Sequence, residues 1–284
     1  MSHPDNEVIL VLILRTIALV AAAIVLLIVL FLLWETLPIL QNIGVARFFN
    51  DSSWQPTNEE FNLTPMVWGT LLVTVGAVLM ATPLGIFSAV FSRYYAPPLL
   101  STCYRRLIEL LAGIPSVVYG FWGLVVLVPI VGRIHPPGTS LLTGTLILTL
   151  MILPTITLVA DASLANVSPE YKRSCAALGL GRWATIRAVI LPAALSGLLT
   201  GVILGTGRAI GETMAVLMVC GNVVQMPNNV FSPVRTLTAN IALEMAYAVG
   251  NHRAALFVSG LVLMAMVFAL VIATELLNRE EIYD

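Results

Sequence analysis

Long apolar stretches separated by shorter polar segments make up most of this chain. Each stretch is long enough to cross a hydrocarbon core of about 30 Å as a helix. The pattern predicts six transmembrane helices, at Val8–Leu33, Met66–Phe91, Leu107–Val131, Leu141–Ala160, Ala193–Gly221 and Ala254–Thr274. Because the number of spans is even, both ends of the chain are expected on the same side of the membrane. The sequence therefore predicts an all-α, polytopic membrane protein.

The composition agrees with this interpretation. Hydrophobic residues make up 58% of the chain and charged residues only 10%, a balance typical of membrane proteins with several spans. The first span does not resemble a cleaved signal peptide, because Asp5 and Glu7 precede it and no small-residue cleavage site follows it. We expect it to remain as a membrane helix.

Basic residues indicate the orientation, because cytoplasmic loops carry an excess of Lys and Arg. An N-terminus on the inside gives the inner loops Arg93, Arg105, Arg106, Lys172, Arg173, Arg182, Arg187 and Arg279. The outer loops then hold fewer basic residues, namely Arg47, Arg133, Arg235 and Arg253. The sequence thus predicts that both termini are cytoplasmic.

Two outer loops are long, Trp34–Pro65 and Asn222–Arg253. The second contains an apolar segment, Thr236–Tyr247, that predicts an interfacial or re-entrant helix. Such loops either receive an extracytoplasmic partner or simply cap the membrane helices. We divide the chain into residues 1–65, holding the first helix and the outer loop, and residues 66–284, holding the remaining helices.

The most informative polar segment is the charged insert Asp161–Pro192. Ser168 is a favoured N-cap and Pro169 suits the first helical position, so a helix is expected to begin there. Gly179 is expected to end that helix, and a second short basic helix runs to Pro192. An ordered helical hairpin of this kind favours docking to a soluble partner. The alternative is a solvated, positively charged inner loop.

The fifth predicted span carries charge within an apolar stretch. Arg208 lies near its middle. At that depth, inserting a charged side chain into the membrane costs about 2.5–3.5 kcal/mol, even on the scales that give the lowest values. Glu212, one turn later, is predicted to pair with Arg208. Gly197, Gly201 and Gly205 fall with these two residues within an arc of about 80°. That face is expected to meet another helix or a water-filled path. The pair either locks helices together or serves transport, since a guanidinium binds phosphate bidentately.

Other chemistry is not indicated. Cys103, Cys175 and Cys220 lack the spacing of a metal or redox site, so no metal or cofactor is expected. The only lysine, Lys172, does not follow a glycine-rich loop, so a Walker A sequence is excluded. No catalytic residues are predicted. If ATP drives this protein, another chain must bind it.

The spacing in the charged insert resembles the "EAA" loop of ABC-importer permeases. Gly179 takes the place of the motif's glycine, and Val189–Pro192 takes that of its aliphatic-x-Leu-Pro end. Arg173 stands where the motif has glutamate, and Glu170 lies one turn earlier. In the family this loop, here at 161–192, docks on the ATPase subunit. The resemblance implies a set of coupling residues comprising Glu170, Arg173, Ala176, Ala177, Gly179, Arg182 and Pro192.

Three further segments, Leu111–Gly120, Arg208–Val216 and Leu237–Glu244, resemble PstC-type permease subunits of bacterial phosphate ABC importers. The resemblance implies a type I ABC-importer permease (MetI-like) fold and no enzymatic activity of its own. It implies that this chain and a PstA-type permease form the path for inorganic phosphate. The implied partners are a dimer of cytosolic ATPase subunits and an extracytoplasmic phosphate-binding protein. No nucleic-acid partner is implied. The implied location is the bacterial inner membrane, in contact with lipid.

Two alternatives remain open from the residues alone. The first is a permease of the same fold for another oxyanion, such as molybdate, tungstate or sulfate, because one arginine does not distinguish tetrahedral anions. The second is an ion-coupled secondary carrier, which leaves the coupling-type loop without a role.

Overall fold

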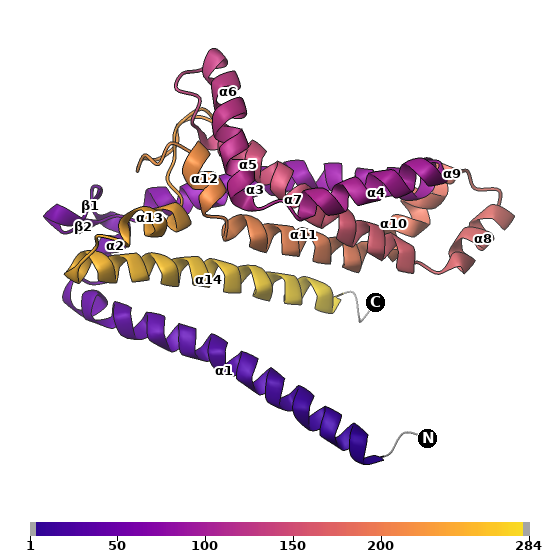
Figure 1. Cartoon of the computed structure of the whole chain (residues 1–284), viewed down its shortest axis with the longest axis horizontal. Coiled ribbons are helices and arrows are strands. Elements are labelled where there is room, and N and C mark those ends of the chain that lie inside the picture. Colours follow the sequence, from indigo (N-terminus) through magenta and orange to yellow (C-terminus); the bar gives the residue numbers. More distant parts are fainter. Residues whose placement is uncertain (1–3, 281–284) are drawn as a thin grey trace.

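The computed structural model describes residues 4–280, and the side chains of residues 10–273. The two ends of the chain, and the side chains of Asp5, Glu7 and Arg279, lie outside these ranges. Long helices dominate the described part: α1 (Pro4–Asn42), α3 (Thr64–Val90), α7 (Leu141–Asn166), α11 (Leu195–Ile210) and α14 (Gly250–Glu280). Figure 1 shows α3, α7, α11 and α14 running side by side, while α1 meets α14 at one end and diverges from it.

Five helices in this range are long and apolar enough to cross a membrane. A sixth is counted if Arg182–Ala193 and Leu195–Ile210, which meet at a bend of 70°, form one broken span. The expected all-α, polytopic architecture is therefore confirmed. Two of the predicted spans have different internal structures from those expected.

The third predicted span, Leu107–Val131, is divided. Helix α4 (Pro98–Ala112) ends at Gly113, and α5 (Ser116–Trp122) begins after Pro115. A π-helical turn at Gly123–Leu127 joins α5 to α6 (Val128–Ile134). The break follows from Pro115, which has no N–H and disfavours a helical conformation of the residue before it. Figure 1 shows α5 and α6 projecting away from the direction of α4.

The fifth predicted span, Ala193–Gly221, is also wrong as a single helix. Helix α11 ends at Ile210, and the short helix α12 (Met214–Val219) follows after three non-helical residues. Helix α13 (Leu237–Glu244) confirms the expected helix in the second outer loop. Its N-cap is Thr236, whose Oγ1 accepts a hydrogen bond of 3.2 Å from the Ala239 N–H.

Helix α7 is the centre of the bundle. Its buried residues form the core with α3 and α12, through Ile147, Leu148, Met151, Ile152 and Ile156 on α7, Val73, Ala77 and Ala81 on α3, and Ala215, Val216 and Val219 on α12. A helix buried on most sides must be apolar all round. This is why α7 lacks a distinct polar face.

The first outer loop is shorter than predicted because α1 continues to Asn42. It then forms α2 (Arg47–Asn50) and a small antiparallel hairpin of β1 (Trp54–Gln55) and β2 (Glu60–Phe61). At the opposite end of the molecule in Figure 1, the charged insert forms α8 (Pro169–Ala177), α9 (Arg182–Thr185), a π-helical turn at Ile186–Ile190 and α10 (Leu191–Ala193).

One buried carboxylate joins the two outer loops to the start of α14. Glu244 accepts hydrogen bonds from Trp54 Nε1 at 2.9 Å and Arg235 Nη1 at 2.6 Å, and its Oε2 lies 2.9 Å from His252 Nε2. Burial by itself raises the pKa of Glu244, but the hydrogen bonds from Trp54, His252 and Arg235 outweigh it and lower that pKa. We call these four residues the outer clasp. It ties both loops to the start of α14.

Candidate functional site

The break between α11 and α12 lies at Gly211, Glu212 and Thr213. Its backbone is held by specific contacts: Glu212 Oε1 accepts a hydrogen bond of 3.0 Å from the Ala215 N–H, and Thr238 Oγ1 donates to the Glu212 carbonyl at 2.7 Å. Irregular backbone within a membrane bundle is tolerated only where protein or a water-filled cavity satisfies it. Here α13 supplies the covering contact through Thr238.

Arg208 lies in the last turn of α11, just before this break. Its Nη1 donates a hydrogen bond of 3.2 Å to Thr155 Oγ1 on α7, and its side chain is partly exposed. Among the described residues, no carboxylate lies within 4.0 Å of its guanidinium. A guanidinium has five N–H donors, so most of them remain available to a ligand.

The predicted ion pair between Arg208 and Glu212 is therefore wrong. The prediction assumed one continuous helix, in which Glu212 follows Arg208 by one turn. Because α11 ends at Ile210, the Glu212 side chain turns to the start of α12 and accepts the Ala215 N–H instead. Among the described residues, Arg208 therefore has no carboxylate partner.

Three of the four glycines of α11, namely Gly197, Gly201 and Gly205, lie against α7. A Cβ added at Gly205 would lie 2.9 Å from Ile156 Cγ1, and one added at Gly201 would lie 3.2 Å from Val159 Cβ. At Gly197 an added Cβ would overlap the Ser163 hydroxyl. Glycine thus lets α11 approach α7 closely enough for Arg208 to reach across to α7.

An apolar cavity of about 410 Å³ lies beside the junction of α4 and α5. Its lining comprises Leu111, Ile114, Val118, Tyr119, Trp122, Leu150 and Leu153. The Tyr119 hydroxyl donates to the Leu111 carbonyl at 2.9 Å, which satisfies a carbonyl at the end of α4. The cavity offers no charged side chain, so it is not itself an anion site.

The charged insert forms the predicted helical hairpin. Ser168 Oγ accepts the Glu170 N–H at 3.3 Å, and Gly179 ends α8 with a φ of +72°. Positive φ is accessible to glycine without a steric penalty. Leu178 is 78% exposed at the tip of the hairpin. The residues implied by the resemblance are all exposed, at Glu170, Arg173, Ala176, Ala177, Gly179, Arg182 and Pro192.

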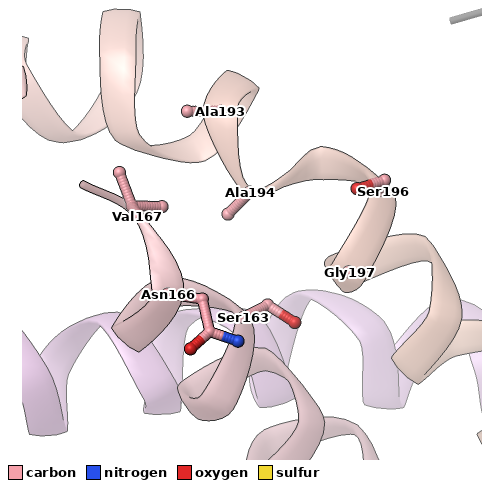
Figure 2. Close-up of a pocket in the computed structure, with 7 residues that line it drawn as sticks. All are labelled: Ser163, Asn166, Val167, Ala193, Ala194, Ser196 and Gly197. Atoms are coloured by element: carbon pink, nitrogen blue, oxygen red, sulfur yellow. The ribbon is translucent and has the colours of Figure 1, made fainter. Parts of the chain in front are cut away.

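A cavity of about 200 Å³ lies at the base of this hairpin. Figure 2 shows the end of α7 on one side and the α10–α11 bend on the other, with the labelled residues Ser163, Asn166, Val167, Ala193, Ala194, Ser196 and Gly197. Both connections of the hairpin to the long helices therefore meet across unfilled space.

The sequence analysis missed the role of Asp161. Its carboxylate pairs with Arg93 Nε at 2.8 Å and Arg105 Nη1 at 3.3 Å, which ties the end of α3 and α4 to α7. A lone acid in the C-terminal part of an apolar helix, with arginines just after α3 and within α4, was the available signal. The outer clasp at Glu244 was missed as well.

Comparison with known families agrees with these features. The family described as binding-protein-dependent transport system inner membrane component matches residues 81–281. The chain belongs to this family. The match includes the broken helix with Arg208, the hairpin and helix α13. This binding-protein-dependent transport component is therefore a membrane permease component by family, in keeping with its several candidate spans.

Individual relatives of this transport component are similar over most of its length. The probable ABC transporter permease protein YqgH of Bacillus subtilis is 40% identical over 84% of this chain and 80% of that protein. The phosphate transport system permease protein PstC of Mesorhizobium japonicum is 37% identical over 82% of this chain and 78% of that protein.

A solved structure supports the expected MetI-like fold. A crystal form of the inward-facing MetNI methionine ABC transporter matches with a TM-score of 0.62, covering 77% of this chain and 95% of that one. At 20% identity, this similarity concerns the fold alone. The predicted fold of an ABC-importer permease is thus confirmed.

Proposed function

We propose that this chain is a permease subunit of an ATP-driven importer and that it forms, with a second permease, the translocation path for inorganic phosphate. The observation that carries the proposal is the unpaired guanidinium of Arg208 at a helix break inside the bundle. The similarity to proteins named as PstC phosphate permeases supports the choice of phosphate.

The chemistry of Arg208 suits a tetrahedral oxyanion. A guanidinium stays charged at any physiological pH and presents donors in a planar fork that matches two phosphate oxygens. Thr155 holds one nitrogen in place, which leaves the rest of the fork free. Arg208 is partly exposed, so an anion can reach it. Glu212, held by the start of α12, does not compete for the guanidinium.

The hairpin of α8 and α9 is proposed as the contact with a cytosolic ATPase dimer. An exposed apolar tip at Leu178 and exposed charges at Glu170 and Arg173 suit docking into a groove of a soluble protein. Hydrolysis of ATP then belongs to that partner, and this chain is not an enzyme. The remaining proposed partners are a PstA-type permease and an extracytoplasmic phosphate-binding protein.

This arrangement sets the proposed orientation. The hairpin must face the ATPase, so its end of the bundle lies in the cytoplasm of a bacterial cell, with both termini on that side of the inner membrane. The outer clasp then lies on the extracytoplasmic side. We also propose residues 1–65 and 66–284 as two structural parts: α1 diverges from the bundle in Figure 1, and the loop after it packs onto the second part through the outer clasp.

The second candidate is a permease of the same fold for molybdate, tungstate or sulfate. These anions share the charge and the tetrahedral shape that Arg208 would recognise in phosphate. Uptake of labelled phosphate, sulfate and molybdate by the reconstituted complex separates the two. Phosphate uptake that the other anions do not match is expected. Uptake of sulfate or molybdate alone would overturn the assignment of phosphate.

Coupling is tested by a matched pair of glycines in the hairpin. Gly179 has a φ of +72°, whereas Gly181 has a φ of −66°, and neither has an atom within 4 Å of an added Cβ. Gly179→Val should therefore strain the turn, while Gly181→Val should not. We expect the first variant to lose ATPase co-purification or ATP-driven uptake and the second to keep both. Normal uptake and ATPase binding by Gly179→Val would refute the docking role.

A further inference from the structure

A third cavity lies between the hairpin and the end of α3. Its volume is about 210 Å³, and its lining comprises Tyr94, Lys172, Arg182, Thr185, Ile186 and Ile190. Tyr94 belongs to the π-helical turn at Phe91–Tyr95 that ends α3. Lys172 lies on α8 and Arg182 on α9, so the cavity brings together the last turn of a membrane helix and both arms of the hairpin.

Two positive charges border this cavity, and neither has an ion pair among the described residues. Lys172 Nζ lies 4.6 Å from the centre of the Tyr94 ring, and the Arg182 guanidinium carbon lies 5.6 Å from the centre of the Tyr95 ring. Within the described part of the chain, no carboxylate lies within 4.0 Å of either cation. The nearby acid Asp161 is already paired with Arg93 and Arg105.

The direction of Lys172 distinguishes it from the outer surface of the hairpin. Lys172 and the buried Cys175 are three residues apart on α8, so they share the face that meets the bundle. Arg173 lies on a different face. Lys172 is therefore exposed to solvent and at the same time lines the cavity beneath the hairpin.

The surroundings resemble a membrane–water interface. Paired tyrosines at the end of a membrane helix are typical of that depth, and Tyr94 and Tyr95 end α3. The next helix, α4, begins nearby at Pro98, and its second residue, Leu99, is 85% exposed. Basic pockets between membrane helices and a neighbouring loop bind the phosphate groups of anionic lipids.

We propose that this cavity binds a phosphate group, with Lys172 and Arg182 as its two basic ligands. The group is supplied either by the headgroup of an anionic phospholipid or by free inorganic phosphate. An anion held there bridges the end of α3 and both arms of the hairpin, and so ties these elements together. Its effect on coupling rests on the proposed function, but the binding itself does not.

Lys172 is the only lysine in the chain. An amine-reactive reagent therefore labels only Lys172 and the N-terminal amine, and the label on Lys172 reports on this cavity. The full chain is reconstituted into nanodiscs of phosphatidylcholine, with or without phosphatidylglycerol, and labelled with or without inorganic phosphate. Peptide mass spectrometry gives the rate at Lys172. We expect anionic lipid or phosphate to slow this rate roughly fivefold, the effect of an added basic contact to an anionic headgroup.

An anionic bilayer also slows amine labelling by lowering the local pH, so variants are compared in the same bilayer. Arg182→Gln should lose the protection, and Arg182→Lys should keep it. Arg106→Gln is the matched control, because Arg106 is an exposed basic residue of α4 without an ion pair in the described structure. It should behave like the wild-type protein.

The two sources give different results. Protection by phosphatidylglycerol alone assigns the lipid headgroup, and protection by inorganic phosphate in a neutral bilayer assigns the free anion. Either supports the site if it depends on Arg182. Equal labelling under all conditions, or protection unchanged in Arg182→Gln, would overturn it. Since no transport is measured, failure here leaves the proposed importer function untouched.

Discussion

The protein contains two places where an arginine and a glutamate lie near each other in the sequence. Arg235 and Glu244 form an ion pair, whereas Arg208 and Glu212 do not. In the outer clasp, Arg235 Nη1 and Glu244 Oε1 are 2.6 Å apart, and Trp54 and His252 complete the shell of the carboxylate. At the helix break, Glu212 is held by the Ala215 N–H, and Arg208 has only Thr155 as a described hydrogen-bond partner. We call the first site closed, because its carboxylate is fully engaged by protein groups, and the second open, because its guanidinium is not.

The difference shows how to separate structural from functional charge in this protein. A buried pair whose donors and acceptors are all used has nothing left for a ligand, and its loss mainly costs stability. Burying an arginine with unused donors inside a membrane bundle costs free energy, and no partner within the protein offsets that cost. Such a cost is consistent with a site that is completed by substrate.

The largest effect is expected at Arg208. Arg208→Gln removes the charge that attracts an anion, so phosphate uptake should fall on the order of a hundredfold, as when one positioned charge-stabilising donor is lost. Arg208→Lys keeps the charge but loses the planar fork, and should retain part of the activity. Uptake is measured in proteoliposomes at matched protein content, with the ATPase confirmed bound. Wild-type uptake by Arg208→Gln would place the pathway elsewhere.

A second prediction concerns the packing that positions this arginine. Gly205→Leu places a side chain where a Cβ already comes within 2.9 Å of Ile156, so it should separate α11 from α7. Overpacking of this kind costs about 1–3 kcal/mol, and the yield of assembled complex should drop. Gly207→Leu is the control, because no atom lies within 4 Å of its added Cβ. Equal complex yields for the two variants would show that α11 does not pack tightly here.

The closed site should respond in stability instead of transport. Glu244→Gln removes the charge that balances Arg235, which should lower the free energy of unfolding by about 1–3 kcal/mol. Uptake per folded complex should stay near the wild-type level. Thermal unfolding in detergent gives the first quantity and proteoliposome uptake the second. A variant that unfolds normally but no longer transports would assign the outer clasp to the path.

The same carboxylate predicts a dependence on pH. The pKa of Glu244 is lowered from its ordinary value of 4.5, so the unfolded state binds its proton more readily than the folded state. The stabilisation is therefore fully present above about pH 4.5 and is lost as the pH falls through the lower, folded-state pKa. Glu244→Gln should remove this part of the acid sensitivity of thermal unfolding. An unchanged acid profile would mean that the outer clasp does not contribute to it.

The hairpin was predictable because its signals are local. Ser168 caps α8, and Gly179 takes the positive φ that ends it, so neighbouring residues determine the structure. The break at 211–213 has a weaker local signal, Gly211 at the C-cap of α11 with Arg208 in the last turn, within a stretch from Ala193 to Gly221 that is long enough for one continuous span. It is held partly by Thr238, far along the chain. The sequence thus located Arg208 and the glycines of α11, but the assumption of a continuous helix gave Arg208 the wrong partner.

The smallest effect is expected at Glu212. This residue gives the most stringent test of the difference between the closed site and the open site. Glu212→Gln keeps an oxygen that can accept the Ala215 N–H, and Arg208 loses no partner. Uptake should therefore stay within about twofold of wild type, because the hydrogen-bond acceptor is preserved. Glu212→Ala removes that acceptor and should destabilise the start of α12 by about 1 kcal/mol, as for a lost helix cap.

Uptake and thermal unfolding of both Glu212 variants decide whether the site is open as described. If Glu212 serves only to hold the break, Glu212→Ala should unfold at a lower temperature than Glu212→Gln, and both should transport. A collapse of uptake in Glu212→Gln as large as in Arg208→Gln would mean that the carboxylate itself works in the path. The two residues would then act as a pair during transport, although the structure holds them apart at rest.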